Sequence, residues 1–451
     1  MSAPAQSPPT GADVVQSLPW RWNTQGLVFL VGGLGFMFDA WDVSLNGVLI
    51  PLLSEEWGLE RSQAALIGTA NLIGMAVGSI VWGTIADRVG RRRAFAWTLA
   101  VFSVFTVAGA LTSGLGWFLV FRFLAGFGLG GCIPVDYALV AEFTPRRHRG
   151  RVLSAMDGWW PIGAALAGFV SAGLVAAWND WRPPLLVMVL PALLVFAVRL
   201  AMPESPMFLA SRGREAEARA VIDGLVKRTG ATPVGYRIEP PAAAAMGGLG
   251  ALTGQLNEVW SYSWRITASS WALFAAILTT YFVALQWLPT FLIGAGYARE
   301  SAFIQSAGMA AVGVIGVVVS TALIEATGRR WLLAVSAPAA CLLLVALGFA
   351  IDLPAVGLTL VLGFGLVVQV AIPVLYTYVS ELYPTRLRGS GFGWASTVSR
   401  VGAGIGPLVF VGWLEPNLGL PGAFGVCLVA VLAAVAAMFA LSPETRGRAL
   451  Y

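Results

Sequence analysis

The segment Gly83-Thr84-Ile85-Ala86-Asp87-Arg88-Val89-Gly90-Arg91-Arg92 lies between two long apolar stretches of the 451-residue chain. A weaker copy, Glu325-Ala326-Thr327-Gly328-Arg329-Arg330, follows another apolar stretch about 240 residues later. Short Arg-rich turns between apolar stretches are typical of the cytoplasmic loops of membrane proteins. The segment therefore predicts a membrane protein, and its return predicts two similar halves.

A second repeat keeps one spacing throughout. At a constant shift of 239 residues, Pro134, Glu142, Pro145, Arg149 and Gly150 recur as Pro373, Glu381, Pro384, Arg388 and Gly389. Pro203-Glu204-Ser205 likewise returns as Pro443-Glu444-Thr445. Two like bundles in the same orientation can tilt about a site between them, so this pattern indicates a rocking transporter.

The composition places lipid, rather than water, around most of the chain. Apolar residues make up 57% of the sequence and charged residues 11%, with a mean hydropathy of +0.77, whereas a soluble domain carries about 25% charged residues. The net charge of +5 is dispersed over short turns, which argues against a nucleic-acid partner. The three cysteines lack metal-binding spacing, and no nucleotide loop or Ser/His/Asp set is visible. We therefore expect no cofactor, no metal and no enzymatic activity.

Twelve stretches are long enough to cross the roughly 30 Å hydrocarbon layer of a membrane as helices. They are residues 24–53, 62–86, 94–113, 115–143, 151–177, 182–202, 264–293, 301–325, 331–351, 354–382, 389–413 and 421–441. The predicted fold is all-α, with twelve transmembrane helices in two pseudo-symmetric six-helix bundles, residues 23–202 and 264–441. The other segments are predicted to be a disordered tail (1–22), a linker with a short amphipathic helix (203–263) and a second tail (442–451).

The distribution of Arg and Lys predicts the orientation. The turns on one side of the predicted helices, and the linker, hold most of the basic residues, whereas the turns on the other side hold only Arg61, Arg182 and Arg299. Basic residues accumulate on the cytoplasmic side. We therefore expect a multi-pass protein of the inner membrane with both ends and the linker in the cytoplasm.

The arrangement resembles the major facilitator superfamily over residues 20 to 447. The Gly83 to Arg92 string matches that superfamily's motif between the second and third helices, whereas the later copy has Thr321, Glu325 and Ala326 in place of Gly, Asp and Arg. Phe38-Asp39-Ala40-Trp41-Asp42 and the stretch 122–131 are similar to elements of the bacterial metabolite:H⁺ symporters, a group with aromatic-acid, niacin and synaptic-vesicle-protein-like members. The resemblance implies proton-coupled transport.

Acidic side chains inside the predicted helices are the candidates for proton coupling, because each costs about 2.5–3.5 kcal/mol at mid-membrane. Asp39 and Asp42 share a helix face with Asn46. Two close carboxylates raise each other's proton affinity, so we expect one of them to be protonated near neutral pH. The alternative is a purely structural pairing with Arg. Asp136 is a third candidate for proton coupling, and both Asp136 and Asp157 are candidates for lining the inner exit path.

Two arginines are the candidates for holding an anion. Arg122 is expected to reach Asp39 or Asp42 and to change partner during the cycle, or else to form a permanent ion pair. Arg400 lies at mid-span with no acid at its depth in the second half, so we expect it to bind the substrate carboxylate or to pair with an acid of the first half. Rings and amides suited to the pocket are Trp41, Tyr137, Tyr281, Gln286, Gln369 and Tyr376.

The charged loops are predicted to control which side of the protein is open. Asp87 is expected to accept hydrogen bonds from a helix N-terminus or to pair with an Arg across the two halves. Glu142 with Arg149, and Glu381 with Arg388, are expected to form matching ion pairs that break and form as the halves rock. The alternative is that these charges only fix topology. The complete set is Gly83, Asp87, Arg88, Gly90, Arg91, Arg92, Glu142, Arg149, Glu325, Arg329, Glu381 and Arg388.

The predicted function is proton-coupled, alternating-access transport of a small organic anion, such as a benzoate or a nicotinate, by a monomer. A sugar or polyol porter and a drug exporter of the same fold are alternatives. A transport-inactive membrane receptor is an alternative of a different class.

Overall fold

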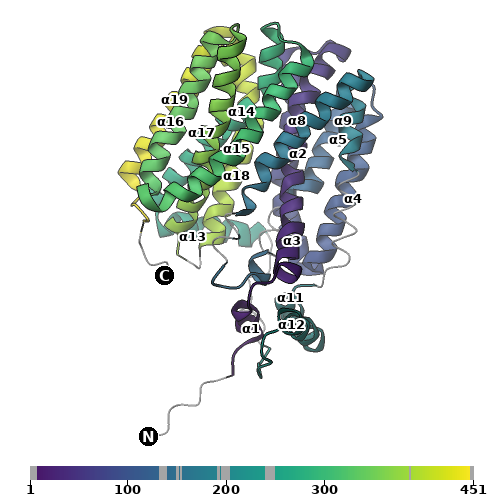
Figure 1. The fold of residues 1–451 in the computed structure, drawn as a ribbon, viewed down its shortest axis with the longest axis vertical. Coiled ribbons are helices and arrows are strands. Elements are labelled where there is room, and N and C mark those ends of the chain that lie inside the picture. Colours follow the sequence, from purple (N-terminus) through teal and green to yellow (C-terminus); the bar gives the residue numbers. More distant parts are fainter. Residues whose placement is uncertain are drawn as a thin grey trace.

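The computed structural model describes residues 8–131, 140–148, 152, 155–189, 193, 204–238, 249–384 and 387–446. Within these residues the chain is helical, and the only strand-like pairing is one bridge between Thr10 and Arg237. Figure 1 shows two bundles of long helices side by side, with short helices gathered at the end near the two termini. This end is named the basal end, and the opposite end the apical end.

The first bundle is formed by the N-terminal half. A π-helical turn, η1 (Trp22–Gly26), leads into α2 (Leu27–Trp57), α3 (Arg61–Val89), α4 (Arg91–Ala110), α5 (Leu115–Gly130), α8 (Trp159–Trp178) and α9 (Arg182–Val187). Gly58 (φ 61°) ends α2, and Gly90 (φ 98°) separates α3 from α4. Other residues adopt such positive φ angles only with strain. Glycine therefore permits the abrupt reversals between these helices.

The second bundle repeats this order in the C-terminal half. It contains α14 (Trp264–Gly294), α15 (Arg299–Thr327), α16 (Arg329–Ala350), α17 (Pro354–Leu382), α18 (Arg388–Val409), the π-helical turn η2 (Phe410–Leu414) and α19 (Glu415–Leu441). Gly328 (φ 85°) separates α15 from α16 as Gly90 separates α3 from α4. The reversal after the second helix of each bundle is thus made in the same way.

Eight helical runs among the described residues are long and apolar enough to cross a membrane. One of them, Arg388–Leu441, has 54 residues and is broken at Gly419; at about 80 Å it is long enough for two crossings. Shorter apolar helices within α4 and α5 match two more predicted crossings, whereas the crossing predicted at 182–202 lies largely outside the described residues. Val104, Val335 and Phe349 on the outer surface are 62–78% exposed, as expected for side chains that contact lipid.

Glycine also lets helices of one bundle approach each other closely. A Cβ atom on Gly126 of α5 would lie 2.2 Å from the carbonyl oxygen of Asn71 on α3. In the second bundle, a Cβ atom on Gly365 of α17 would lie 2.0 Å from the carbonyl oxygen of Met309 on α15. Small residues at such contacts are a common basis of helix packing in membranes. The repeat in the sequence is therefore also a repeat in packing.

The two bundles meet where α2 packs on α14, α8 on α15 and α3 on α18. At the apical end, Arg61 pairs with Glu415, and Arg299 Nη2 lies 2.5 Å from Glu55 Oε2. Deeper in the same interface, Thr69 Oγ1 donates a hydrogen bond to the carbonyl oxygen of Gly404 at 2.6 Å. These contacts hold the apical ends of the bundles together.

Short helices form a layer at the basal end: α1 (Gly11–Ser17), α11 (Pro206–Ser211), α12 (Glu215–Thr229) and α13 (Leu249–Tyr262). The helix α12 agrees with the amphipathic helix predicted in the linker. The prediction that residues 1–22 form a disordered tail is wrong for α1. A capping box between Thr10 and Asp13 starts this helix, and its apolar side chains pack with those of α12 in one buried cluster. Packing against α12 buries the apolar side chains of α1, which a helix this short could not bury on its own.

Candidate functional site

A network of buried charged and amide side chains lies among α2, α3 and α5. Arg122 Nη1 donates to Asp42 Oδ1 at 2.8 Å, and Arg122 Nη2 donates to Asn46 Oδ1 at 2.9 Å. Asn71 Nδ2 donates to Asp42 Oδ2 at 2.7 Å, and Asn46 Nδ2 donates to Asn71 Oδ1 at 3.2 Å. Each of the four side chains is at most 1% exposed. Both oxygens of Asp42 are therefore paired, as a buried carboxylate requires.

This network places Arg122 on Asp42 rather than on Asp39. It also contains Asn71, which was not among the residues predicted from the sequence. The signal for Asn71 was the one amide side chain in the uncharged stretch 64–82. Polar side chains at membrane depth usually face a partner.

Asp39 lies in a different environment. It is fully buried, and neither of its carboxylate oxygens accepts a hydrogen bond from the residues that the structure describes. Its ion pair is with Arg400 of α18, Nη2 to Oδ2 at 3.7 Å, and therefore joins the two bundles. The Arg400 side chain is 13% exposed. This pair can separate without breaking any described hydrogen bond, whereas Asp42 would have to give up its bonds to Arg122 and Asn71.

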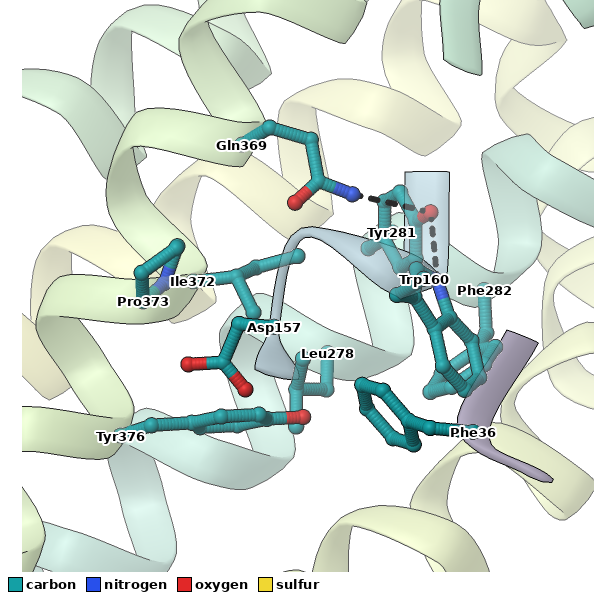
Figure 2. A pocket seen from close by; sticks show the side chains of 10 residues that line it. All are labelled: Phe36, Asp157, Trp160, Leu278, Tyr281, Phe282, Gln369, Ile372, Pro373 and Tyr376. Carbon is teal, nitrogen blue, oxygen red and sulfur yellow. Dashed lines mark hydrogen bonds between the residues drawn. The ribbon is translucent and has the colours of Figure 1, made fainter. Parts of the chain in front are cut away.

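A narrow cavity with about 20 Å³ of free space lies between the two bundles, which in this conformation is room for about one water molecule. Figure 2 shows its walls, half of whose residues are aromatic; they come from α2, α8 and the turn before it, α14 and α17. The lining residues are Phe36, Asp157, Trp160, Leu278, Tyr281, Phe282, Gln369, Ile372, Pro373 and Tyr376. Flat apolar walls with a few polar groups are typical of a site for a small planar molecule.

In this cavity the Tyr281 hydroxyl of the second bundle is hydrogen-bonded to Trp160 of the first bundle. Its oxygen accepts one hydrogen bond from Trp160 Nε1 at 3.0 Å and a second from Gln369 Nε2 at 3.2 Å (Figure 2). A tyrosine hydroxyl has one proton to donate besides its lone pairs. Because two donors already occupy the oxygen, this proton is available to an acceptor in the cavity.

The predicted binding residues thus divide into two groups. Tyr281, Gln369 and Tyr376 line the cavity, and Tyr376 lies within electrostatic reach of both Arg400 and Asp39. Four others lie elsewhere: Arg122 and Asn46 belong to the Asp42 network, Trp41 stacks on Phe38 with ring centroids 6.4 Å apart, and Gln286 packs against Gly68 of α3.

Several predicted residues fall where the structure gives no description. Asp136, Tyr137 and Arg149 lie outside the described residues. The backbone around Asp87, Arg91 and Arg92 is helical, but their side chains are not described.

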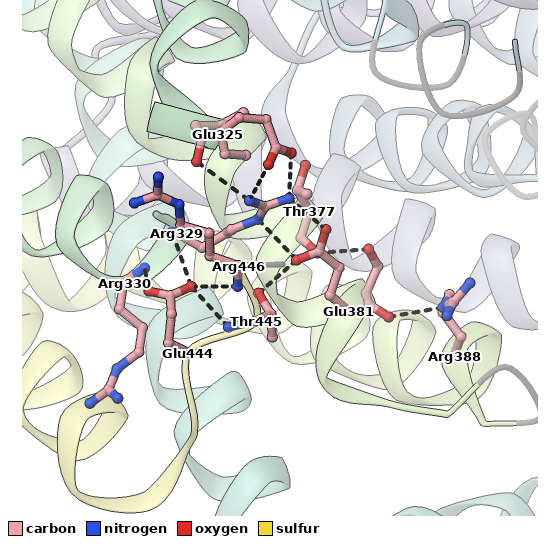
Figure 3. Close-up of polar contacts among 11 residues, drawn as sticks. Glu325, Arg329, Arg330, Thr377, Glu381, Arg388, Glu444, Thr445 and Arg446 are labelled. Atoms are coloured by element: carbon pink, nitrogen blue, oxygen red, sulfur yellow. Dashed lines mark hydrogen bonds and ion pairs between the residues drawn. The ribbon is translucent and has the colours of Figure 1, made fainter. Parts of the chain in front are cut away.

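A charged cluster at the basal end holds helices of the second bundle together (Figure 3). Arg329 Nη2 lies 2.6 Å from Glu325 Oε1 and 3.0 Å from Glu381 Oε1. Thr445 Oγ1 donates to Glu381 Oε2 at 2.6 Å. The prediction that Glu381 pairs with Arg388 is therefore wrong in this structure. Arg388, at the start of α18, instead donates its Nε–H to the carbonyl oxygen of Ser380 at 3.1 Å.

The first bundle repeats this cluster in part. Ser205 Oγ donates to Glu142 as Thr445 Oγ1 donates to Glu381. A Cβ atom on Gly90 would lie 2.7 Å from Glu204 Oε2, and one on Gly328 would lie 3.2 Å from Glu444 Oε2. The three sequence repeats thus meet at one place in each bundle. Each cluster ties helices of a single half together.

Glu444 anchors the start of α16 and gives a pH-dependent prediction. Burial raises its pKa, but hydrogen bonds from the backbone N–H groups of Arg330, Arg446, Thr445 and Arg329 outweigh burial and hold the pKa below its usual value. A carboxyl with a lowered pKa stabilises the fold above its unfolded pKa of about 4.3 and loses that effect as the pH falls.

A Glu444→Gln variant should therefore lose roughly 1 kcal/mol of its free energy of unfolding at pH 7. It should unfold at a lower temperature than the unchanged protein. The difference from the unchanged protein should shrink below about pH 4. Thermal unfolding in detergent over this pH range measures both. An equal difference at every pH would show that the charge of Glu444 is not the cause.

Two bundles of apolar helices, a cavity between them and an ion pair that joins them define a membrane transport protein rather than an enzyme. The sequence matches the Major Facilitator Superfamily over residues 32–407, so the chain belongs to this family. The prediction of twelve transmembrane helices in two pseudo-symmetric bundles is thereby confirmed.

Curated relatives and solved structures agree with this assignment. The chain is 31% identical to the niacin transporter NiaP of Acinetobacter baylyi, over 97% of this chain and 98% of that one. It is 28% identical to a gallate transporter of Pseudomonas putida, over 98% and 96% of the two chains. The fold is similar to the partially occluded inward-open xylose transporter XylE from E. coli, with a TM-score of 0.77, 19% identity, and coverage of 95% of this chain and 100% of that chain.

Proposed function

We propose that the chain moves a small aromatic or heteroaromatic carboxylate across the inner membrane of a bacterium, together with a proton. The observation that carries this proposal is the Asp39–Arg400 pair, which joins the two bundles and lies near the ring-lined cavity. The relatives, which include niacin, gallate and 4-hydroxybenzoate transporters, support this substrate class.

The pair supplies a route for coupling. Protonation of Asp39 removes its negative charge and leaves Arg400 free to bind a carboxylate with two parallel hydrogen bonds. The bound anion then neutralises Arg400 as Asp39 did before. When Asp39 loses the proton, its negative charge again competes with the substrate carboxylate for Arg400. The substrate is then released. Proton and substrate therefore strengthen each other's binding, which is the thermodynamic basis of symport.

The arrangement of contacts suggests which parts move. We propose that the basal end faces the cytoplasm, because the turns and linker at this end carry most of the basic residues. The apical pairs Arg61–Glu415 and Arg299–Glu55 would then close the outer side. Residues 23–202 and 264–441 would rock as two bodies in a monomer, with residues 203–263 as the linker. The basal clusters would keep each body rigid.

Uptake into liposomes tests the proposal. Purified protein should accumulate labelled nicotinate or benzoate severalfold when the outside is more acidic, because inward proton flow drives the cycle. A proton ionophore should abolish this accumulation, and protein-free liposomes give the baseline. Uptake that is indifferent to the gradient and the ionophore would exclude symport.

The role of Arg400 is checked in the same preparation. A carboxylate that binds the protein should raise its melting temperature by mass action, and Arg400→Ala should remove this shift. Arg400→Lys keeps the charge but not the planar fork, and should show an intermediate shift. A shift produced by xylose but not by carboxylates would favour a sugar porter.

A further inference from the structure

The Trp160 side chain of the first bundle forms a wall of the cavity and contacts the second bundle directly. Its ring meets that of Phe282 on α14 edge to face, with centroids 5.9 Å apart, and lies 5.4 Å from the ring of Phe36 on α2. Its Nε1 donates a hydrogen bond of 3.0 Å to the Tyr281 hydroxyl, and Tyr281 is only 3% exposed. One side chain thus joins the two bundles by a ring contact and by a buried hydrogen bond (Figure 2).

The cavity in this conformation is too small for the proposed substrate. Its free space is about 20 Å³, whereas sites for small organic ligands enclose about 300–1,000 Å³. A ring carboxylate can therefore enter only if the walls move apart. Trp160 and Tyr281 belong to different bundles, so this movement separates them. A hydrogen bond of this kind is lost once its donor and acceptor are about 3.6 Å apart.

The backbone around Trp160 is suited to such a movement. Residues 155–156 are helical, residues 157–158 form a turn, and α8 begins directly afterwards at Trp159. Gly158 and Pro161 flank the two tryptophans, and kinks in helices usually occur at such residues. The start of α8 can therefore shift relative to α14 without a break in a continuous helix.

We infer that the Trp160–Tyr281 hydrogen bond is a latch, which holds the cavity closed and which must break before the substrate binds. This inference rests on the proposed function of the cavity, and it leaves the substrate carboxylate with Arg400. A site that is open in only a fraction of the molecules binds its ligand with an apparent affinity reduced by that fraction. Loss of the latch should therefore raise the affinity, whereas loss of a group that only contacts the substrate lowers it.

Dissociation constants of the purified full-length protein for benzoate and nicotinate test the latch. Trp160→Phe keeps an aromatic ring and removes the donor, so both constants should fall roughly two- to tenfold, as expected for one neutral hydrogen bond. The factor should be similar for the two compounds, because the cavity opens before any contact that distinguishes them. The control is Trp97→Phe on α4, where the tryptophan is 60% exposed and outside the cavity. This variant should bind as the unchanged protein does.

Two further variants separate the hydrogen bond from the extra space that a smaller ring leaves. Tyr281→Phe already lacks the latch, so adding Trp160→Phe to it should bring no further gain in affinity. Gln369→Met removes the other hydrogen bond to Tyr281, which lies within the second bundle. Because it keeps the latch, this variant should show no gain.

The outcomes are distinct. An unchanged or weaker affinity in Trp160→Phe, or an equal gain with and without the Tyr281 hydroxyl, would overturn the latch and leave the proposed function intact. If neither compound binds any form of the protein, the proposed function fails, and the latch is then tested without a ligand. A cysteine placed in the cavity wall by Leu278→Cys should react with a small water-soluble thiol reagent roughly two- to tenfold faster when Trp160→Phe is added. Equal reaction rates would overturn the latch as well.

Discussion

An Asp39→Asn variant should lose proton-driven accumulation of substrate and keep the exchange of substrate across the membrane. The asparagine has nearly the same size but no proton to lose, so it cannot compete with the substrate for Arg400. Arg400, now without its partner at 3.7 Å, should hold the carboxylate at any pH. Exchange only requires the loaded protein to rock, whereas accumulation requires the unloaded protein to return after releasing a proton.

The pH profile of binding separates this mechanism from a structural role. In the unchanged protein, substrate affinity should fall as the pH rises, because ionised Asp39 competes for Arg400. In Asp39→Asn the affinity should be nearly constant over the same range. Calorimetric titration from pH 5 to about pH 8.5 spans the range in which coupling groups commonly operate. The matched control is Asp352→Asn, which removes an exposed carboxylate and should keep the original profile.

Two results would contradict the assignment. Accumulation by Asp39→Asn at the original rate would show that the proton binds elsewhere. A steep pH profile that persists in the variant would lead to the same conclusion. Asp42→Asn, tested beside it, would then show whether the second carboxylate of the helix carries the proton.

The fold was predictable because its signals are local and repeated. Length and hydropathy determine each crossing, and the repeats of Gly90 and Gly328 set equivalent turns in the two halves. The shared helix face of Asp42 and Asn46, which both bind Arg122, followed from helical spacing. None of these inferences required knowledge of which helices are neighbours.

The partners of individual charges were less predictable, because they depend on packing between distant segments. Glu381 is close in sequence to Arg388, yet it pairs with Arg329, since α15, α16 and α17 converge at the basal end. The part that Asn71 plays in the Asp42 network depends on the packing of α3 against α2 and α5, which the sequence does not reveal. Asp157 and Tyr281 are similarly separated in sequence and brought to one cavity by α8 and α14.

The Asp42 network should make Arg122 essential for stability. Replacing Arg122 by methionine would leave a fully buried carboxylate without its cation, which typically costs 3–5 kcal/mol, or about a thousandfold in the folding equilibrium. Melting temperature and chemical unfolding in detergent measure this loss. The exposed pair Arg61–Glu415 provides the control, since the Arg61 side chain is 58% exposed and Arg61→Met should cost at most about 1 kcal/mol.

A second substitution shows whether the loss comes from the unpaired charge. Asp42→Asn added to Arg122→Met removes the negative charge and keeps a side chain that can bond Asn71, so the double variant should recover much of the stability. This recovery would identify the network as a fixed part of the first bundle, against which the looser Asp39–Arg400 pair moves. A single Arg122→Met variant as stable as Arg61→Met, but unable to transport, would instead show that Arg122 changes partner during the cycle.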